Sequence, residues 1–171
     1  MDTVHRMLHA AREVLDLKQS DVTEATGIST RTLNRMENGS NLVSFETLAK
    51  LRDHFSALGV TLVEQADGKR WALEFNSKLA PAPLEVDGSF KIYDPLPGSV
   101  LKAARILVAM NQEELSAKTG LGHTTIRRLE KSDASVRPEK AFLLQRAFEE
   151  HGLEFIKPTS RRGWLLQYAS S

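Results

Sequence analysis

Two short segments of this sequence carry side chains that can hydrogen-bond to the edges of DNA base pairs. Arginine can pair with the O6 and N7 of guanine, asparagine can pair with adenine, and the threonine methyl group packs on the thymine methyl group. Such side chains must project together from one helix face to reach a base pair. Apolar residues at helical spacing leave these polar ones facing outward: Thr30, Arg31, Asn34 and Arg35, then His123, Thr124, Arg127 and Arg128.

The two segments belong to a repeat whose copies are offset by 93 residues without a gap (112 − 19 = 93). Identities at this offset include Gln19 with Gln112, Gly27 with Gly120, Thr32 with Thr125, Arg35 with Arg128, and Glu37 with Glu130. A helix, a glycine turn and a second helix with a polar outer face form the arrangement that places a recognition helix in the major groove. The sequence therefore predicts a tandem helix-turn-helix DNA-binding protein.

The residues around the glycine turn predict where the short helices begin. In the second copy Asn111 can cap a helix, and Glu114 three residues later completes a capping box. Lys18 takes the place of that cap in the first copy, which leaves the start of its helix less certain. Ser29 is expected to cap the recognition helix of the first copy, whereas Gly122 offers no side chain at the equivalent position.

Each copy also contains an arginine and a glutamate that suggest a buried ion pair. Arg12 and Arg105 occupy equivalent positions on two amphipathic first helices, and Glu37 and Glu130 end the two recognition helices. Partly buried charges are usually paired, so we expect structural Arg12–Glu37 and Arg105–Glu130 pairs.

A further helix and a β-hairpin follow the motif in each copy. The apolar spacing predicts helices over 45–58 and 139–151, which close a four-helix core in each half. Alternating apolar residues then predict strands over 60–64 and 70–75, joined by Asp67-Gly68, and over 153–156 and 163–168. Trp71 and Trp164 keep the 93-residue period.

A two-stranded hairpin alone is marginally stable in water, so each hairpin needs a partner surface. The simplest partner is the hairpin of the other copy, which would create one shared sheet and an internal pseudo-two-fold axis with both recognition helices on one side. Packing of each hairpin on its own helices is the alternative. The predicted fold is mainly α, with two helix-turn-helix domains in tandem that resemble lambda-repressor-like domains, each followed by a short β-hairpin.

The domain boundaries follow from the repeat. Residues 1–75 and 94–171 are the two predicted domains, and residues 76–93 form a linker without a counterpart in the repeat. This linker contains Pro81, Pro83 and Asp87-Gly88, and residues 89–93 could add a strand. Its 18 residues span at most roughly 60 Å, enough to join domains on half-sites about 34 Å apart.

Composition narrows the functional classes. The chain has 41% hydrophobic and 26% charged residues, no cysteine and no apolar run of membrane-spanning length, so we expect a globular cytoplasmic protein without disulfides. The net charge of +1 is unevenly distributed: residues 1–75 sum to −2 (9 − 11) and residues 94–171 to +3 (12 − 9). Near-neutrality argues against strong non-specific binding to polyanions, but it permits a basic stripe that faces DNA.

No residue set suggests catalysis or a cofactor. His5 and His9 lie four residues apart on a helix, but no third ligand accompanies them, so we expect no metal site. Nucleophile elbows, phosphate loops and dinucleotide fingerprints are missing from the sequence. We therefore expect neither an enzyme nor a bound cofactor.

The repeated motif resembles the phage-repressor and Cro type of helix-turn-helix protein, the XRE family, over about residues 4–58 and 97–151. The resemblance implies that the glutamine opening the second helix contacts phosphate, and that early residues of the third helix contact bases. Carried over residue by residue, these are Gln19, Ser29, Thr30, Arg31 and Arg35, then Gln112, His123, Thr124 and Arg128. It also implies the two Arg–Glu pairs. We thus expect a sequence-specific regulator, a repressor, that binds an imperfect palindrome in double-stranded DNA.

The strand after the last helix also resembles that of antitoxins that pair with HipA-type kinases. The alternative function is therefore an antitoxin and autorepressor, or an antiactivator, in which one domain, more readily the acidic first one, binds a toxin or another regulator. In either case the tandem chain is expected to form an internal pseudo-dimer, with no membrane partner. Further dimerisation stays open.

Overall fold

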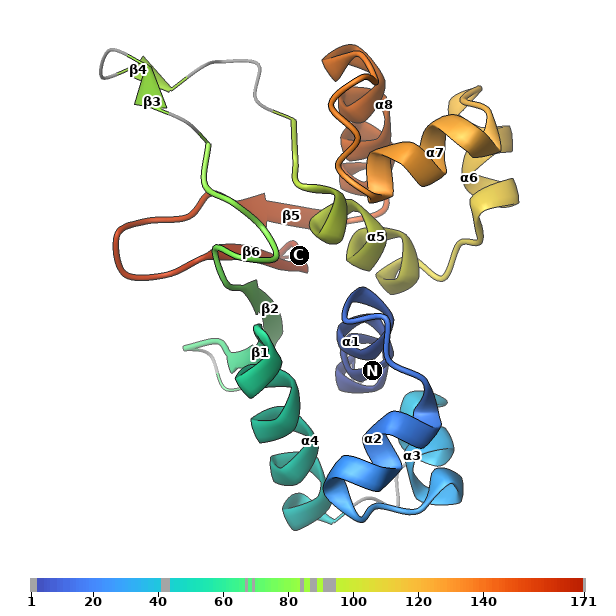
Figure 1. Cartoon of the computed structure of the whole chain (residues 1–171), viewed down its shortest axis with the longest axis vertical. Coiled ribbons are helices and arrows are strands. Elements are labelled where there is room, and N and C mark those ends of the chain that lie inside the picture. Colours follow the sequence, from blue (N-terminus) through green and yellow to red (C-terminus); the bar gives the residue numbers. More distant parts are fainter. Residues whose placement is uncertain are drawn as a thin grey trace.

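The computed structural model describes residues 3–40, 44–66, 68, 70–83, 85–86, 89–90 and 95–170, which form two similar halves joined by a linker (Figure 1). The first half contains α1 (Val4–Val14), α2 (Gln19–Thr26), α3 (Thr30–Glu37), α4 (Phe45–Leu58), β1 (Val60–Glu64) and β2 (Trp71–Phe75). The second half contains α5 (Gly98–Leu107), α6 (Gln112–Thr119), α7 (His123–Glu130), α8 (Pro138–Glu149), β5 (Leu153–Ile156) and β6 (Trp164–Tyr168).

Each half folds around its first helix, as the apolar spacing predicts. Met7 and Leu8 on α1 are buried together with Leu33 on α3 and with Leu51 and Phe55 on α4. The second half repeats this core with these residues: Val100, Leu101, Ile126, Leu144 and Phe148. The predicted fold is confirmed: two helix-turn-helix units in tandem, each followed by antiparallel strands.

The hairpins of the two halves pair with each other in one four-stranded antiparallel sheet, in the order β1-β2-β6-β5. At its centre Leu73 lies opposite Leu166, and Phe75 lies opposite Trp164. This is the shared sheet expected from the marginal stability of a lone hairpin. Of the Asp67-Gly68 turn predicted between β1 and β2, Asp67 lies outside the described residues.

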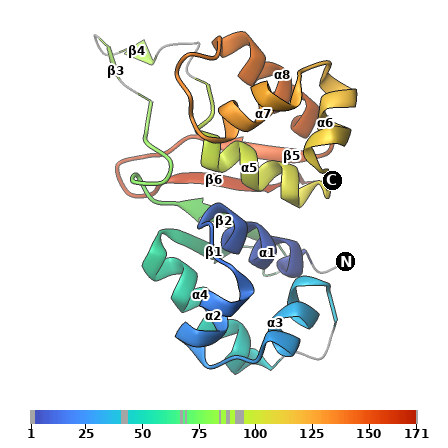
Figure 2. The same ribbon diagram turned by 45° about the vertical axis from the view of Figure 1, so that its right-hand side comes forward.

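The first helices of the two halves, α1 and α5, also pack against each other (Figure 2). Several hydrogen bonds cross this junction. Lys102 Nζ donates to Glu13 O at 2.6 Å and to the Asp16 carboxylate at 2.8 Å. Arg6 Nη1 donates to Leu107 O at 3.2 Å. Sheet and helices together make one continuous core from both halves.

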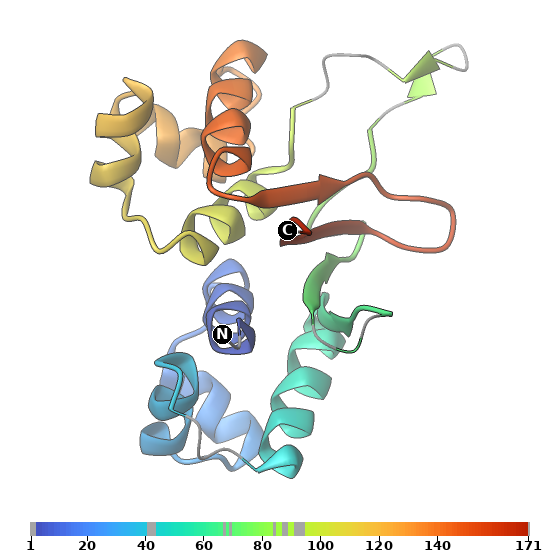
Figure 3. The same cartoon turned by 180° about the vertical axis from the view of Figure 1, so that it is seen from behind.

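The linker contacts the second half where it leaves the sheet. Trp164 Nε1 donates to Pro81 O at 3.1 Å, and Ser99 Oγ donates to Leu79 O at 2.7 Å. Farther along, β3 (Glu85–Val86) pairs with β4 (Ser89–Phe90), and Figures 1 and 3 show this pair standing apart from both helical units. The strand predicted over 89–93 is present at its first two residues, while residues 91–93 and the Asp87-Gly88 pair lie outside the described residues.

One helix differs at its ends from the sequence prediction of 139–151. Helix α8 begins at Pro138, because proline is favoured in the first helical turn, where its missing N–H costs no hydrogen bond. It ends at Glu149, and Gly152 then adopts a positive φ of 80° that turns the chain into β5. Among the helices of the described residues, we find none that combines the length and the apolar character needed to cross a membrane.

Candidate nucleic-acid interface

The outward face of α3 carries the polar side chains that the sequence places there. Leu33 and Met36 are buried against the core, whereas Thr30, Arg31, Asn34 and Arg35 are all exposed. Ser29 is exposed as well, and its Oγ accepts a hydrogen bond from Thr32 N at 3.1 Å, which caps the helix. The cap fixes the start of α3 and so the direction of the exposed side chains.

The face of α7 has the same organisation with different chemistry. His123, Thr124, Arg127 and Arg128 are exposed, and Ile126 is fully buried. Gly122 occupies the cap position without a side-chain hydrogen bond, as expected. The second unit therefore presents two adjacent arginines where the first presents Asn34 and Arg35.

The turn between the two helices of each unit depends on a glycine with left-handed backbone. Gly27 has a φ of 72° and Gly120 a φ of 74°, a conformation that costs other residues free energy. Both glycines end their helix and accept the sharp change of direction toward the recognition helix. The equal angles give the two units the same internal geometry.

The second helix of each unit begins at the predicted glutamine, but the two starts are stabilised differently. In the second half Asn111 Oδ1 accepts from Glu114 N at 2.8 Å, and Asn111 N donates to the Glu114 carboxylate at 2.7 Å, a complete capping box. In the first half Lys18 has no acceptor atom to offer. Asp21 supplies one part of the box by accepting from Lys18 N at 2.7 Å, and α2 still begins at Gln19.

A buried ion pair ties the first helix to the recognition helix in the first half. Arg12 Nε donates to Glu37 Oε1 at 2.6 Å, Arg12 Nη2 donates to Oε2 at 3.1 Å, and Nη1 donates to Leu17 O at 2.8 Å. Burial disfavours the charged guanidinium, but the hydrogen bond and the attraction to Glu37 outweigh it, so the pKa of Arg12 is raised. The Arg12 guanidinium is therefore charged at neutral pH.

The second half repeats this network atom by atom. Arg105 Nε and Nη2 donate to the Glu130 carboxylate at 2.5 and 3.1 Å, and Nη1 donates to Met110 O at 3.2 Å. The structure thus contains the Arg–Glu pair expected in each half. Each pair links α1 to α3, or α5 to α7, and holds the end of the recognition helix against the core.

The glutamine found at the same position in both copies, Gln19 or Gln112, also hydrogen-bonds to the glutamate of the Arg–Glu pair. Gln19 Nε2 donates to Glu37 Oε2, and Gln112 Nε2 donates to Glu130 Oε2, both at 3.0 Å. Each side-chain amide has a second N–H. Because the hydrogen bond to the glutamate already fixes the side-chain rotamer, the glutamine can donate that second hydrogen to a phosphate at little cost in conformational entropy. The backbone amides at the start of the helix lie beside it.

The units differ most at the last arginine of each recognition helix. Arg128 Nε donates to Asp133 Oδ2 at 2.7 Å, and Arg128 Nη2 also donates to Ser135 Oγ. Hydrogen bonds from the Ser135 hydroxyl and from Arg128 hold the pKa of Asp133 well below its usual range. Ser40 occupies the position equivalent to Asp133 (133 − 93 = 40), and within the described part of the chain Arg35 has no such partner.

The sequence analysis did not identify Asp133 as part of the interface. The signal was available, because an acidic residue stands five positions after Arg128 where the first copy has serine. We call the Asp133–Arg128 pair with Ser135 the arginine latch. It holds the Arg128 guanidinium in one orientation.

Both helix-turn-helix units lie on the same side of the molecule. In Figures 1 and 3 the α2–α3 unit is at the lower end of the long axis and the α6–α7 unit is at the upper end, and both are on the side away from the sheet. Figure 2 shows α1 and α5 stacked between them. The two units can thus face one extended partner together.

A basic cleft of about 530 Å³ opens between the halves beside α7. Lys102, Arg127 and Lys131 line it, together with Gln112 and the end of α1 at Val14. Its cations lie next to the proposed phosphate contact of Gln112. Asp16 and Glu130 also line the cleft and pair with Lys102 and Arg105.

The histidines near the N-terminus serve local packing. His9 Nε2 lies 3.7 Å from the Glu13 carboxylate one turn later, and the His5 ring lies close to Gly39. In the ranges that the structure describes, no three of the side chains His, Cys, Asp and Glu are grouped to hold a metal ion.

Comparison with protein families gives a match on both halves. A family model described as helix-turn-helix matches residues 8–64 and again residues 101–155. The two matches begin 93 residues apart (101 − 8 = 93), which is the period found in the sequence. No curated protein and no solved structure matches the chain.

Proposed function

The chain belongs to the helix-turn-helix family of DNA-binding regulators, XRE type, and from that membership we propose that it is a repressor that binds an imperfect palindrome through both halves of one polypeptide. Family members of this type are DNA-binding proteins rather than enzymes. The proposal adds the shape of the site, the residues that recognise it and the direction of the regulation.

The central support for this proposal is the internal pseudo-two-fold axis. Leu73 and Leu166, equivalent residues of the repeat, lie opposite each other, so the axis passes between β2 and β6. A dimer with such an axis binds two half-sites of opposite orientation, whose centres are about 34–36 Å apart on one DNA face. Here the linker joins the two units covalently and the shared sheet holds them together, so binding needs no association of separate chains.

The proposed base contacts are the exposed residues on the recognition helices. They are Thr30, Arg31, Asn34 and Arg35 on α3, and His123, Thr124, Arg127 and Arg128 on α7. Ser29, at the start of α3, joins the base-contacting group, whereas Gln19 and Gln112 contact the DNA phosphates. Because Asn34 and Arg127 are equivalent in the repeat but differ in chemistry, the two half-sites should differ in sequence, which makes the palindrome imperfect.

Repression follows from the stretch of DNA that the bound protein covers. A protein that spans two neighbouring major grooves on one face occupies DNA that RNA polymerase must reach when the site overlaps a promoter. Steric exclusion of this kind requires no contact with the polymerase. The functional test is a reporter gene whose promoter carries the selected site, and expression should fall when the protein is produced.

Selection of bound fragments from a random DNA pool tests the proposed site. We expect two unlike half-sites at a fixed spacing of one helical turn. Arg35→Ala should relax the base preference in one half-site and Arg128→Ala in the other, whereas Gln112→Ala should weaken binding to all sequences alike. Arg52→Ala, an exposed arginine on α4, is the matched control and should change neither. A pool that returns no enriched sequence at physiological salt contradicts the proposal.

Charge favours one competing function. Residues 1–75 sum to −2, so the first unit would be drawn to phosphate more weakly than the second, and it could contact a protein instead. In that case footprinting would protect a single half-site, and substitutions on α3 would leave it unchanged. Protection of two half-sites, each lost on mutation of one unit, would reject this alternative.

A further inference from the structure

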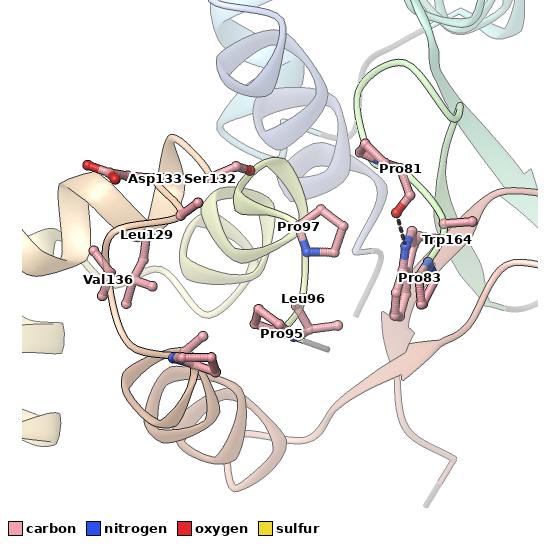
Figure 4. A pocket seen from close by; sticks show the side chains of 14 residues that line it. Pro81, Pro83, Pro95, Leu96, Pro97, Leu129, Ser132, Asp133, Val136 and Trp164 are labelled. Atoms are coloured by element: carbon pink, nitrogen blue, oxygen red, sulfur yellow. Dashed lines mark hydrogen bonds between the residues drawn. The ribbon is translucent and has the colours of Figure 1, made fainter. Parts of the chain in front are cut away.

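A cavity of about 520 Å³ lies between the linker and the second helix-turn-helix unit (Figure 4). Its volume falls in the range of small-molecule sites. One wall comes from the linker at Pro81 and Pro83 together with Trp164 at the start of β6, and another from the loop and helix that follow α7. The repeat has no second linker, so the first half lacks the elements that build this cavity.

Prolines dominate the walls of this linker cavity. Five of the six prolines of the chain line it, namely Pro81, Pro83, Pro95, Pro97 and Pro138. Proline has a fixed φ and no backbone N–H, so it loses little conformational entropy when a ligand packs on it. Trp164 is buried and holds the linker wall in place through its hydrogen bond to Pro81 O. The walls are therefore preorganised for an occupant.

Among the described residues that line the linker cavity, Asp133 is the sole charged one. Figure 4 shows its carboxylate turned outward, where it holds Arg128. Among the described lining residues Ser132 has the sole hydroxyl, and its Oγ accepts from Gly98 N at 2.8 Å. A charged ligand would lose hydration without gaining a partner, whereas an uncharged apolar one gains by leaving water.

The cavity shares a wall with the arginine latch. Leu129 lines it from α7, and Ser132, Asp133 and Val136 line it from the following loop. The other side of this loop carries the carboxylate that orients Arg128. At Gly98 a Cβ would lie 2.5 Å from Leu129 O and from Ser132 N, so α5 is in tight contact with the same wall. A molecule pressed against this loop therefore acts on the latch directly.

We propose that the linker cavity binds an uncharged apolar molecule with one or two rings, and that this occupant changes DNA binding through the arginine latch. The binding site goes beyond the proposed function, while its effect on DNA rests on that function. The linker therefore joins the two halves and also supplies one wall of an effector site. The other wall comes from the second unit, and among the described residues the first unit has no equivalent site.

Binding can be tested without DNA by titrating the full chain with 2-naphthol and following the two tryptophan indole N–H signals by NMR. The Trp164 signal should shift, because its N–H lies at the cavity wall, and the Trp71 signal should stay in place. Trp71→Phe assigns the two signals. The anionic analogue 2-naphthoate should bind about tenfold more weakly or not at all, because its charge would be desolvated.

Blocking variants locate the site. Ala134 is exposed at the cavity and Ala82 lies on the opposite wall, so Ala134→Phe and Ala82→Phe should each weaken 2-naphthol binding by about tenfold by filling the space. Ala57→Phe, on the exposed face of α4, is the matched control and should bind like the unmodified chain. Equal shifts of both indoles, equal binding of the two naphthyl probes, or unchanged binding by both blocked variants would overturn the site.

The effect on DNA forms a separate arm of the test. With a selected DNA site in hand, saturating 2-naphthol should change its affinity by about fivefold or more at the half-site bound by α7, and this effect should vanish in Asp133→Ser. If no DNA site can be selected, the proposed function fails while the NMR test of the cavity still decides the binding site. If the probe binds the cavity and DNA affinity is unchanged, coupling through the latch is wrong.

Discussion

Leu73 lies opposite Leu166 in the central strand pair, and these two leucines are equivalent residues of the repeat (73 + 93 = 166). The neighbouring pairs follow the same symmetry, because Ala72 faces Gln167 and Glu74 faces Leu165. Ala72 thus faces the repeat equivalent of Glu74 (74 + 93 = 167), and Glu74 faces the repeat equivalent of Ala72 (72 + 93 = 165). This exchange places a two-fold axis at the centre of the strand pair. The chain therefore folds as a dimer of its own halves, with both leucines fully buried at the axis.

Truncation at the axis should destabilise the whole chain rather than one half. Leu73→Ala and Leu166→Ala should each lower the free energy of unfolding by about 2–5 kcal/mol, because each leaves a cavity in the shared core. Urea unfolding followed by circular dichroism measures the loss. Leu143→Ala, at a position 47% exposed on α8, is the control and should cost less than about 0.5 kcal/mol. Two separate unfolding transitions in the unmodified chain would contradict a shared core.

The buried ion pairs predict a second effect on stability. Glu37→Gln removes the buried counter-charge of Arg12 and leaves only the part-exposed Glu13 carboxylate, 2.9 Å from Arg12 Nη1. It should cost about 3–5 kcal/mol, as measured by urea unfolding. Glu130→Gln should cost somewhat less, because the side chain of Arg105 is 15% exposed against 9% for Arg12. The exposed Glu24→Gln on α2 serves as the control. A loss below about 1 kcal/mol in both variants would mean that the pairs contribute little.

Sequence repetition predicted the symmetric features of this protein well. The positions of the glycine turns, the two Arg–Glu partners and the pairing of the hairpins all follow from side chains present at equivalent positions in both copies. Most of these features depend on nearby residues only. The pairing of the hairpins needs one assumption, which is that a marginally stable hairpin pairs with the edge strand of its equivalent in the other copy. The outward residues of α3 and α7 were likewise placed correctly by the spacing of Leu33 and Ile126.

The features that break the symmetry were not predictable in the same way. Asp133 was overlooked because its partner Arg128 was assigned to base contacts alone, without asking what stood near it after the helix. Trp164 keeps the period of Trp71, yet Trp164 is buried under the linker and Trp71 is half-buried. The linker occurs once, so the comparison of the copies says nothing about where it packs.

Tyr168 predicts how the junction between the halves depends on pH. Burial raises the pKa of Tyr168 above 10.0, although nearby Arg6 opposes the shift. A raised folded-state pKa means that the neutral phenol stabilises the fold below pH 10, and that this contribution is lost as pH rises through the folded value. In Tyr93→Phe, where Tyr168 is the sole tyrosine, the phenolate absorbance should titrate above pH 10. A midpoint below 10 would contradict its burial.

The hydroxyl of Tyr168 also donates to Leu107 O at 2.6 Å, where it joins the sheet to the end of α5. Tyr168→Phe should therefore lower the free energy of unfolding at neutral pH by about 0.5–1.5 kcal/mol, the net worth of one hydrogen bond. The difference from the unmodified chain should shrink at a pH above the folded pKa, because the phenolate can no longer donate. A difference that persists there would assign the effect to packing.

The arginine latch predicts that Arg128 distinguishes between bases more strictly than Arg35, because, of these two in the described part of the chain, only the Arg128 side chain is held in one orientation. Asp133→Ser gives the second unit the residue that the first has at Ser40, so Arg128 loses its fixed orientation. The preference for one base at its position should fall by about fivefold or more, measured by competition among half-site variants. Ser40→Asp tests the converse, since a carboxylate there should restrict Arg35 and sharpen or redirect its preference.

The pH range of the latch follows from the lowered pKa of Asp133. A depressed folded-state pKa means that the ion pair is complete above the usual value of 3.8 and is lost as pH falls through the lower folded value. Base preference at the Arg128 position should therefore be constant between about pH 5 and 8 in the unmodified chain. His123 lies five residues before Arg128 at the start of α7, and His123→Gln removes its imidazole ring. If preference at the Arg128 position still varied with pH in His123→Gln, Asp133 would not be the group that holds the arginine.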